Sequence, residues 1–134
     1  MQDGVKLPGR HAGAGELFQL LGEGRPRTRA DLAAATGQAR STITARVDVL
    51  MAAGLIAPAG EASSTGGRPP TTFAFRPSAR VVLAVDLGAT HARLAVTDLA
   101  STVLASTETT IDIADGPEAV LGWIAEHGRA LVAR

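Results

Sequence analysis

Five side chains able to contact nucleic acid are gathered between positions 40 and 46 of this 134-residue sequence. They are Arg40, Ser41, Thr42, Thr44 and Arg46. A guanidinium group can bond bidentately to guanine, and hydroxyl groups can bond to bases or phosphates. Apolar residues at helical spacing lie among and after them and predict one buried stripe: Ile43, Val47, Leu50 and Met51. We therefore expect the five polar side chains on or near the outer face of one helix.

A second candidate for nucleic-acid contact is the extended strip Gly66-Gly67-Arg68-Pro69-Pro70. This strip has little side-chain bulk, and it carries one guanidinium group in its middle. An arginine presented in this way can enter a narrow minor groove, where the negative potential of DNA is strongest. Gly67, Arg68 and Pro69 are the predicted contact residues. The alternative interpretation is an ordinary flexible loop in a helical bundle that binds no nucleic acid.

Asp86, Gly88 and Thr90 form a third candidate pattern, with the spacing Asp-x-Gly-x-Thr. Gly88 would let the backbone approach a phosphate closely, Thr90 offers a hydroxyl, and Asp86 could hold a hydrated Mg²⁺. A plain β-turn containing Asp and Gly explains the same pattern. The three histidines have no paired spacing and the chain has no cysteine, so we predict no metal site.

Three predicted helices would position the first two candidates. The first ends near Gly22, and the second begins after the N-cap residue Thr28, with Asp31 as an acidic residue in its first turn. Gly37 ends the second helix, and the third spans residues 40–53. The short glycine-containing turn between the last two lets them cross steeply. This order predicts a helix-turn-helix whose last helix can enter the major groove.

The period of the apolar residues changes after Gly54, where two short strands are predicted at 55–57 and 72–75 around a Gly/Pro/Ser-rich loop.

Three further strands are predicted at 81–85, 93–97 and 103–111, and the first of them is expected to be buried. A helix that begins at Pro117 follows them. Three strands and one helix leave an open sheet edge and an uncovered apolar face. We expect residues 81–134 to be marginally stable alone, or to pair with another copy or a partner chain.

The net charge of zero averages two unlike segments. Residues 1–80 carry ten basic and six acidic side chains, a net charge of +4, whereas residues 81–134 carry three and seven, a net charge of −4. Such a sign change indicates segments with different partners, and the basic one suits DNA. The absence of cysteine, of a signal-length apolar start and of an apolar run near 18 residues favours a cytoplasmic protein outside the membrane.

Several blocks together resemble the N-terminal winged helix of ROK-family regulators (repressor, open reading frame, kinase). They are Thr36-Gly37, Arg40-Ser41-Thr42-Ile43-Thr44, Arg46-Val47, Leu50, Ala53-Gly54-Leu55-Ile56, Gly66-Gly67-Arg68-Pro69-Pro70 and Phe75-Arg76-Pro77. Val82 to Leu99 resembles the opening hairpin of the family's sugar-kinase-like domain. The resemblance implies an α+β chain: a flexible arm at 1–12, a winged helix-turn-helix at 13–78, and an incomplete actin-like (ribonuclease-H-like) α/β segment at 79–134.

The resemblance implies a sequence-specific transcriptional regulator, a repressor of sugar-related genes, that binds double-stranded DNA as a homodimer on the bacterial nucleoid. Two departures, Ala89 for glycine and His91 for lysine, add bulk beside the phosphate path and make the Asp86 pattern vestigial. The family's catalytic Asp, sugar contacts and zinc cluster fall beyond position 134. We therefore expect no catalytic residue and no cofactor, and these residues do not support control by a sugar effector. The alternatives are an assembly module or an inactive remnant of an ATP-dependent sugar kinase.

Overall fold

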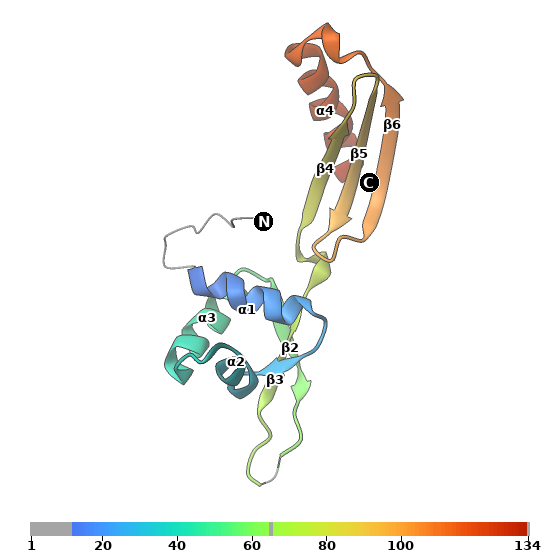
Figure 1. Cartoon of the computed structure of the whole chain (residues 1–134). Coiled ribbons are helices and arrows are strands. Elements are labelled where there is room, and N and C mark those ends of the chain that lie inside the picture. Colours follow the sequence, from blue (N-terminus) through green and yellow to red (C-terminus); the bar gives the residue numbers. More distant parts are fainter. Residues whose placement is uncertain (1–11, 65, 134) are drawn as a thin grey trace. The chain divides into compact units, whose positions relative to one another are not determined.

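A computed structural model describes residues 12–64 and 66–133 of the chain, which divide into two compact units at Arg76–Pro77 (Figure 1). The predicted arm at 1–12 lies outside the described residues, apart from Ala12 at the start of the first helix. The division falls beside the boundary that the sequence predicts at 78–79. Each unit has its own buried core.

The first unit combines three helices with a three-stranded antiparallel sheet. Its elements are α1 (Ala12–Gly22), β1 (Arg27–Thr28), α2 (Arg29–Thr36), α3 (Arg40–Ala52), β2 (Ile56–Glu61) and β3 (Thr71–Phe75). The strand order is β1-β3-β2, so the last strand in sequence is the central one. The three predicted helices and the two predicted strands are present, and β2 extends beyond its predicted end through a register shift between Pro58 and Gly60.

Local hydrogen bonds fix both ends of α2. The Thr28 hydroxyl oxygen accepts from the Asp31 backbone N–H at 3.0 Å, and the Asp31 carboxylate accepts from the Thr28 backbone N–H at 2.8 Å. This reciprocal pair is a capping box. The hydrogen bond from the Thr28 backbone lowers the pKa of Asp31 below its ordinary value of 3.8. Gly37 ends α2 at φ 68°, a left-handed conformation that glycine adopts without strain.

The core of the first unit is aliphatic around one aromatic ring. Its fully buried side chains come from all three helices and from β3: Leu17, Leu21, Leu32, Ile43, Val47 and Phe73. Met51 is 37% exposed, so its prediction as part of the buried stripe of α3 is wrong. Met51 lies in the last turn of α3, shortly before the chain turns at Gly54 toward β2. The stripe therefore ends at Leu50.

The strand β1 was not foreseen from the sequence. Arg27 pairs with Phe73 and Thr28 with Thr72, which adds a two-residue edge strand to β3. Two residues are too few to show the alternation that marks a strand. The pairing places the N-cap of α2 directly on the sheet, so that α2 starts at a position fixed by β3.

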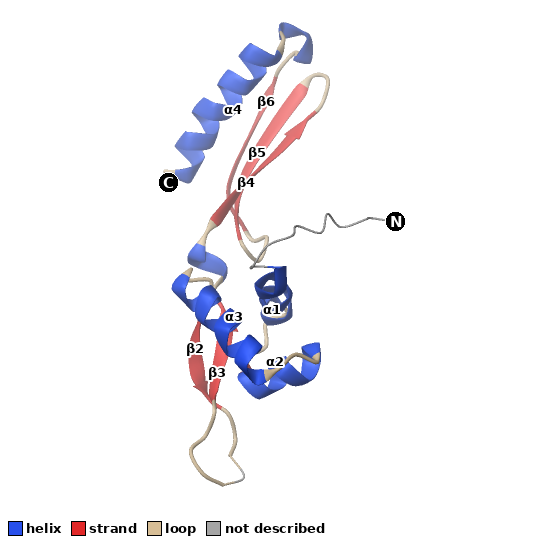
Figure 2. Ribbon diagram, turned by 90° about the vertical axis from the view of Figure 1, so that its left-hand side faces the viewer, coloured by secondary structure: helices blue, strands red, loops and turns tan. Residues whose placement is uncertain are grey.

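The second unit is an antiparallel sheet with a helix along one face (Figure 2). Its elements are the 3₁₀ turn η1 (Pro77–Ala79), β4 (Val81–Leu87), β5 (His91–Asp98), β6 (Val103–Thr110), the 3₁₀ turn η2 (Ile113–Asp115) and α4 (Pro117–Val132). The strand order is β4-β5-β6. Leu94 and Val96 of β5 form the core with Leu131 of α4, and Trp123 and Ile124 pack against it.

The prediction that residues 81–85 form a buried strand is wrong in one respect, because β4 is an edge strand. All seven of its residues are exposed, with Val81 and Val82 both at 47% and Val85 at 43%. Within the described residues β4 pairs only with β5, so its second edge has no neighbour. The apolar run predicts the strand correctly, but burial depends on a neighbour that these residues do not supply. The open edge and apolar surface expected from the sequence are therefore present.

Candidate nucleic-acid interface

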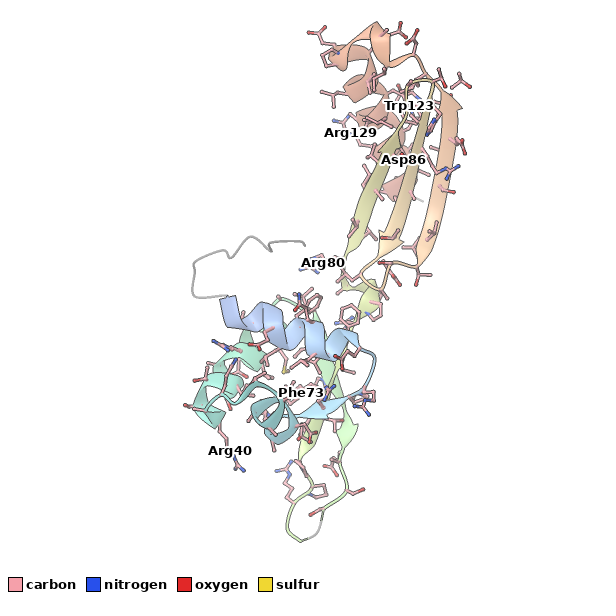
Figure 3. The ribbon with its side chains drawn as sticks, viewed as in Figure 1. Arg40, Phe73, Arg80, Asp86, Trp123 and Arg129 are labelled. Atoms are coloured by element: carbon pink, nitrogen blue, oxygen red, sulfur yellow. The ribbon has the colours of Figure 1, made fainter. Side chains whose placement is uncertain are left out.

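Packing of α3 decides which of its side chains face outward. Ile43, Val47 and Leu50 are buried at 0%, 0% and 4% exposure, and they hold α3 against the core. The opposite face carries the predicted contact residues near the start of the helix, where Ala39 provides no side-chain cap. Three of them are exposed and one is half-buried: Arg40, Ser41 and Thr44, then Thr42. Figure 3 shows the Arg40 side chain extending outward from the start of α3.

Arg46 is placed differently from the other predicted contact residues. Its side chain is half-buried, and its guanidinium lies directly against Gly13 of α1, in the space that a side chain at position 13 would fill. It also donates a hydrogen bond to the Gln38 side-chain oxygen, and the Gln38 amide donates to Glu16 at 2.9 Å. Arg46 therefore joins α3, the turn before it and α1, and the structure does not bring it together with Arg40.

The predicted arginine strip forms a loop between β2 and β3. The Ala62 backbone N–H donates to Pro70 at 2.9 Å and closes the base of the loop, which projects past the strand ends (Figure 1). Gly67 has φ 85°, a backbone conformation that favours glycine. Arg68 is exposed and Pro69 is half-buried. The loop thus presents one guanidinium, beyond the sheet that carries it.

A groove of about 300 Å³ connects the start of α3 with the stem of this loop. Its lining residues come from α2, α3 and the beginning of β3: Arg29, Ala30, Arg40, Thr44, Pro70 and Thr71. Two are basic and none is acidic, so the groove is electropositive. Arg29 and Thr71 were not identified from the sequence. Each is an ordinary polar residue in its own segment, and only the pairing of β1 with β3 brings the two segments together.

The Asp86 pattern lies at the turn between β4 and β5. The Gly88 backbone N–H donates to the His91 carbonyl at 2.9 Å and closes the turn. The His91 imidazole occupies the space above Gly88 into which a side chain would project, and its Nε2 lies 3.9 Å from the Asp86 carboxylate. A group that approached Gly88 from this side would therefore meet the His91 imidazole.

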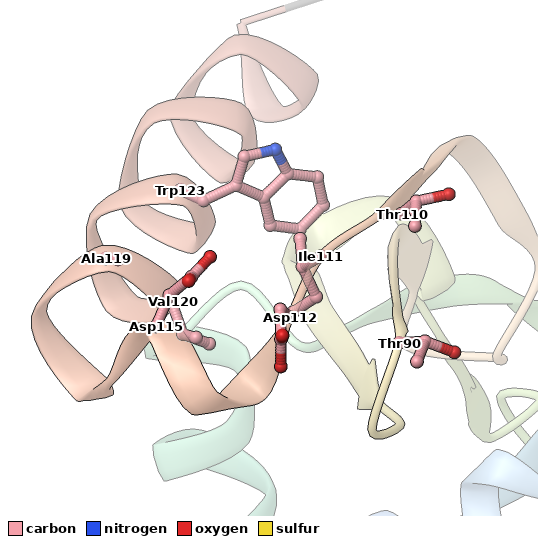
Figure 4. A pocket seen from close by; sticks show the side chains of 8 residues that line it. All are labelled: Thr90, Thr110, Ile111, Asp112, Asp115, Ala119, Val120 and Trp123. Atoms are coloured by element: carbon pink, nitrogen blue, oxygen red, sulfur yellow. The ribbon is translucent and has the colours of Figure 1, made fainter.

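Thr90 lines a separate cavity of about 540 Å³ (Figure 4). The cavity lies among the β4–β5 turn, the end of β6, η2 and α4, and its lining residues are Thr90, Thr110, Ile111, Asp112, Asp115, Ala119, Val120 and Trp123. Asp86 and Gly88 do not line it, so the structure does not assemble the three residues of the pattern around one space. Two carboxylates and no basic side chain border the cavity, which makes it unfavourable for a phosphate.

The described residues contain neither a metal-binding cluster nor a membrane-spanning helix. No three His, Cys, Asp or Glu side chains among them are close enough together to hold a metal ion. None of the helices in the described ranges combines the length and the apolar character that a membrane span requires.

Comparison with known proteins identifies relatives among bacterial repressors. The chain is 33% identical over 88 residues to the xylose repressor of Bacillus spizizenii and 32% identical over 88 residues to the xylose repressor of Bacillus subtilis. Each match covers 66% of this chain and 23% of the relative, so the chain spans about a quarter of the length of these relatives. No family model matches the chain.

A solved structure matches most of the chain. It is the crystal structure of a ROK-family transcriptional regulator described as a homologue of the MLC protein of E. coli. The TM-score is 0.72 at 26% sequence identity, and the match covers 90% of this chain and 32% of the other.

Proposed function

The chain belongs to the ROK family of transcriptional regulators, and from this membership we propose that it is a repressor that binds double-stranded DNA. The first unit acts as a winged helix-turn-helix, with α2 and α3 as the helix pair and the β2–β3 loop as the wing. One observation carries the proposal: the exposed residues of α3, the basic groove and the stem of the arginine-bearing loop adjoin one another. Repression is proposed because the two curated relatives are xylose repressors.

In this proposal α3 enters the major groove with its N-terminal turn first. Arg40 pairs with a guanine edge, and the hydroxyls of Ser41, Thr42 and Thr44 bond to bases or phosphates. Arg68 enters the adjacent minor groove from the wing, supported there by Gly67 and Pro69. Arg46 contributes indirectly, because its contacts with Gly13 and Gln38 hold the turn before α3 against α1. The target genes are sugar-related and the site of action is the bacterial nucleoid, by analogy with the xylose repressors.

We propose that the chain acts as a homodimer whose second copy pairs along β4. This edge is apolar at six of its seven positions, and all seven are exposed. Antiparallel pairing centred on Ala84 would place Leu83 opposite Val85 of the second copy, on the face of the sheet that carries α4. The other free edge, β6, begins with three apolar residues and continues with five hydroxyl-bearing or acidic ones, so it is a poorer template.

The oligomeric state tests this part of the proposal directly. Sedimentation velocity on the whole chain should show a dimer, and Val85→Lys should shift it to a monomer because a charge then lies in the paired edge. Val103→Lys is the matched control, since Val103 is 60% exposed on the other edge. A wild-type monomer at all accessible concentrations, or dissociation by the control substitution, would refute pairing along β4.

The geometry of the second unit does not favour activity as a sugar kinase. His91 fills the space above Gly88, and the cavity that contains Thr90 is bordered by carboxylates. We propose that the Asp86 pattern is a structural turn and that the chain hydrolyses no ATP. A coupled ATPase assay with and without sugars checks this, and sugar-dependent turnover would overturn it.

Selection of bound duplexes from a random pool by the whole chain tests the function. We expect an enriched site with twofold symmetry, because a dimer presents two copies of α3 to two half-sites. Arg40→Ala should abolish the enrichment, whereas Arg129→Ala is a charge-matched control on the exposed surface of α4. Pools that show no enriched sequence, or equal enrichment with Arg40→Ala, would contradict sequence-specific binding by α3. Salt-insensitive binding without preference would favour the assembly-module alternative.

A further inference from the structure

The groove between α3 and the stem of the β2–β3 loop has the composition of an anion site. Its polar groups are two guanidiniums and two hydroxyls, from Arg29, Arg40, Thr44 and Thr71, and its remaining lining residues are Ala30 and Pro70. Arg29, Arg40 and Thr44 come from the two helices, and Thr71 comes from the strand that follows the loop. Four converging donors with no carboxylate in the lining favour a negatively charged group with several acceptor oxygens.

Arg29 is held in position by the core of the first unit. Its guanidinium carbon lies 4.6 Å from the centre of the Phe73 ring, a cation–π contact with a side chain that is 2% exposed. One of its terminal nitrogens lies 3.8 Å from the Asp48 carboxylate, whose side chain is 65% exposed. Its Nε is buried and, among the described residues, has no hydrogen-bond partner. The guanidinium is thus oriented by an aromatic face while part of its donor capacity stays unused.

Arg40 faces the same groove from the first residue of α3, and its side chain is exposed. No carboxylate lies within salt-bridge distance of it in the described ranges. Thr44 is one helical turn further along α3 and brings its hydroxyl to the same wall. Thr71 stands opposite, at the start of β3, and is also exposed.

We propose that this groove binds one phosphodiester group of the DNA backbone, held by the Arg29 guanidinium with the hydroxyls of Thr44 and Thr71. The inference rests on the proposed DNA binding and adds a specific contact to it. A backbone segment that passes from the major groove occupied by α3 to the minor groove beneath the loop would cross this position. Guanidinium groups bind phosphate oxygens bidentately, and such contacts fix the register of a protein on DNA without reading its sequence. Arg29 is therefore a positioning contact, distinct from the base contact assigned to Arg40.

Salt dependence of binding tests the charge contribution of Arg29. Affinity for a duplex carrying the selected site is measured by fluorescence anisotropy over a range of salt concentrations, for wild type, Arg29→Gln and Arg25→Gln. Arg25 is the matched control because it is exposed and lies outside the groove. For Arg29→Gln we expect the slope of log K against log salt to become shallower by about 0.9 per bound chain, with sequence preference unchanged. An unchanged slope for Arg29→Gln, or an equal change for Arg25→Gln, would overturn the proposal.

A neutral linkage locates the phosphate. Methylphosphonate groups are placed one at a time along the duplex, and we expect one linkage in each half-site to weaken wild-type binding by on the order of tenfold. The same linkage should have no further effect on Arg29→Gln, because the contact is already lost. Equal sensitivity of Arg29→Gln and wild type at every linkage would refute the contact. Circular dichroism verifies that the variants are folded. If Arg29→Gln is unfolded, the coupling between the neutral linkage and the substitution is measured with Thr71→Val instead, and absence of that coupling would then refute the contact.

The two proposals fail in different ways. If the random pool yields no enriched site, sequence-specific repression is contradicted, and the slope difference between wild type and Arg29→Gln on a mixed-sequence duplex still tests the groove. If a site is enriched but neither slope nor linkage sensitivity depends on Arg29, the repressor proposal stands and the phosphate site is refuted.

Discussion

Replacing Thr28 with alanine should destabilise the first unit while leaving the second unchanged. The hydroxyl accepts the Asp31 N–H at 3.0 Å, and loss of such an N-cap costs about 1 kcal/mol. Thr28 is 5% exposed, so the substitution also removes a buried methyl group, which is worth about 0.8 kcal/mol. Together the two effects lower the free energy of unfolding by roughly 2 kcal/mol. Since Thr28 also belongs to β1, its effect extends to the contact between α2 and the sheet.

Two spectroscopic signals separate the units in a urea titration. The sequence contains one tryptophan, Trp123 of α4, so tryptophan fluorescence follows the second unit alone. Far-UV circular dichroism follows the helices of both. We expect Thr28→Ala to shift the circular dichroism transition of the first unit to lower urea by roughly 1–2 M, at the slope typical of a small domain. The fluorescence transition should not move. A shift below roughly 0.3 M in the first unit would refute the assigned energy of the cap.

Acid titration tests the other half of the capping box. Hydrogen bonds from Thr28 lower the pKa of Asp31 in the folded state below 3.8, so the ionised carboxylate stabilises the fold at neutral pH. This stabilisation is complete at a pH above the pKa of Asp31 in the unfolded state, and it disappears as the pH falls through the lower pKa of Asp31 in the folded state. Asp31→Asn should therefore lose stability at neutral pH and lose less in strong acid. Glu126→Gln, on the exposed surface of α4, serves as the control. An equal loss for Asp31→Asn at both pH values would contradict this assignment.

Three further changes have defined outcomes. Gly37→Ala should cost about 1 kcal/mol in a urea titration because φ is 68°, whereas Gly15→Ala, in α1 with open space around it, should stabilise by up to about 1 kcal/mol. Phe73→Ala should cost about 3–5 kcal/mol and abolish DNA binding without moving the fluorescence transition of Trp123; retained binding would show that the core does not hold the interface. The wild-type slope of log K against log salt should be about −0.9 or steeper per bound chain, because Arg29 neutralises one phosphate, and a slope near zero in anisotropy titrations would contradict this contact.

The elements of the first unit could be predicted because their boundaries are set by local chemistry. Thr28 and Asp31 cap one end of α2, and Gly37 closes the other, all within ten residues of sequence. Gly54, with φ 70°, ends the helical segment that contains α3 in the same way. The outward face of α3 followed from the spacing of its apolar residues. These signals need no knowledge of what packs against the helix.

The features that the sequence did not reveal all depend on contacts between distant segments. Arg46 has the same spacing as an outward-facing residue, but the absence of a side chain at Gly13 lets its guanidinium settle against α1. Arg29 joins the groove only because β1 pairs with β3, which aligns residue 28 with residue 72. A pattern within one segment cannot report such pairings, so the basic groove could be recognised only once the sheet was known.

The exposure of β4 could not be predicted from its composition either. An apolar run indicates the environment for which a strand is suited, and the neighbours of the strand decide whether it is buried. Val81 to Val85 is continuously apolar, a pattern typical of a strand covered on both faces and flanked on both sides. Yet β4 has a neighbour on one side only, and its Leu83 is 37% exposed although it contacts Gly128 of α4. A strand of this composition at a free edge is a template for another chain. The composition of β4 favours burial, but its residues are exposed and one of its edges has no neighbour among the described residues. This difference is the physical reason to expect a second chain to pair with β4, and Val85→Lys tests that expectation directly.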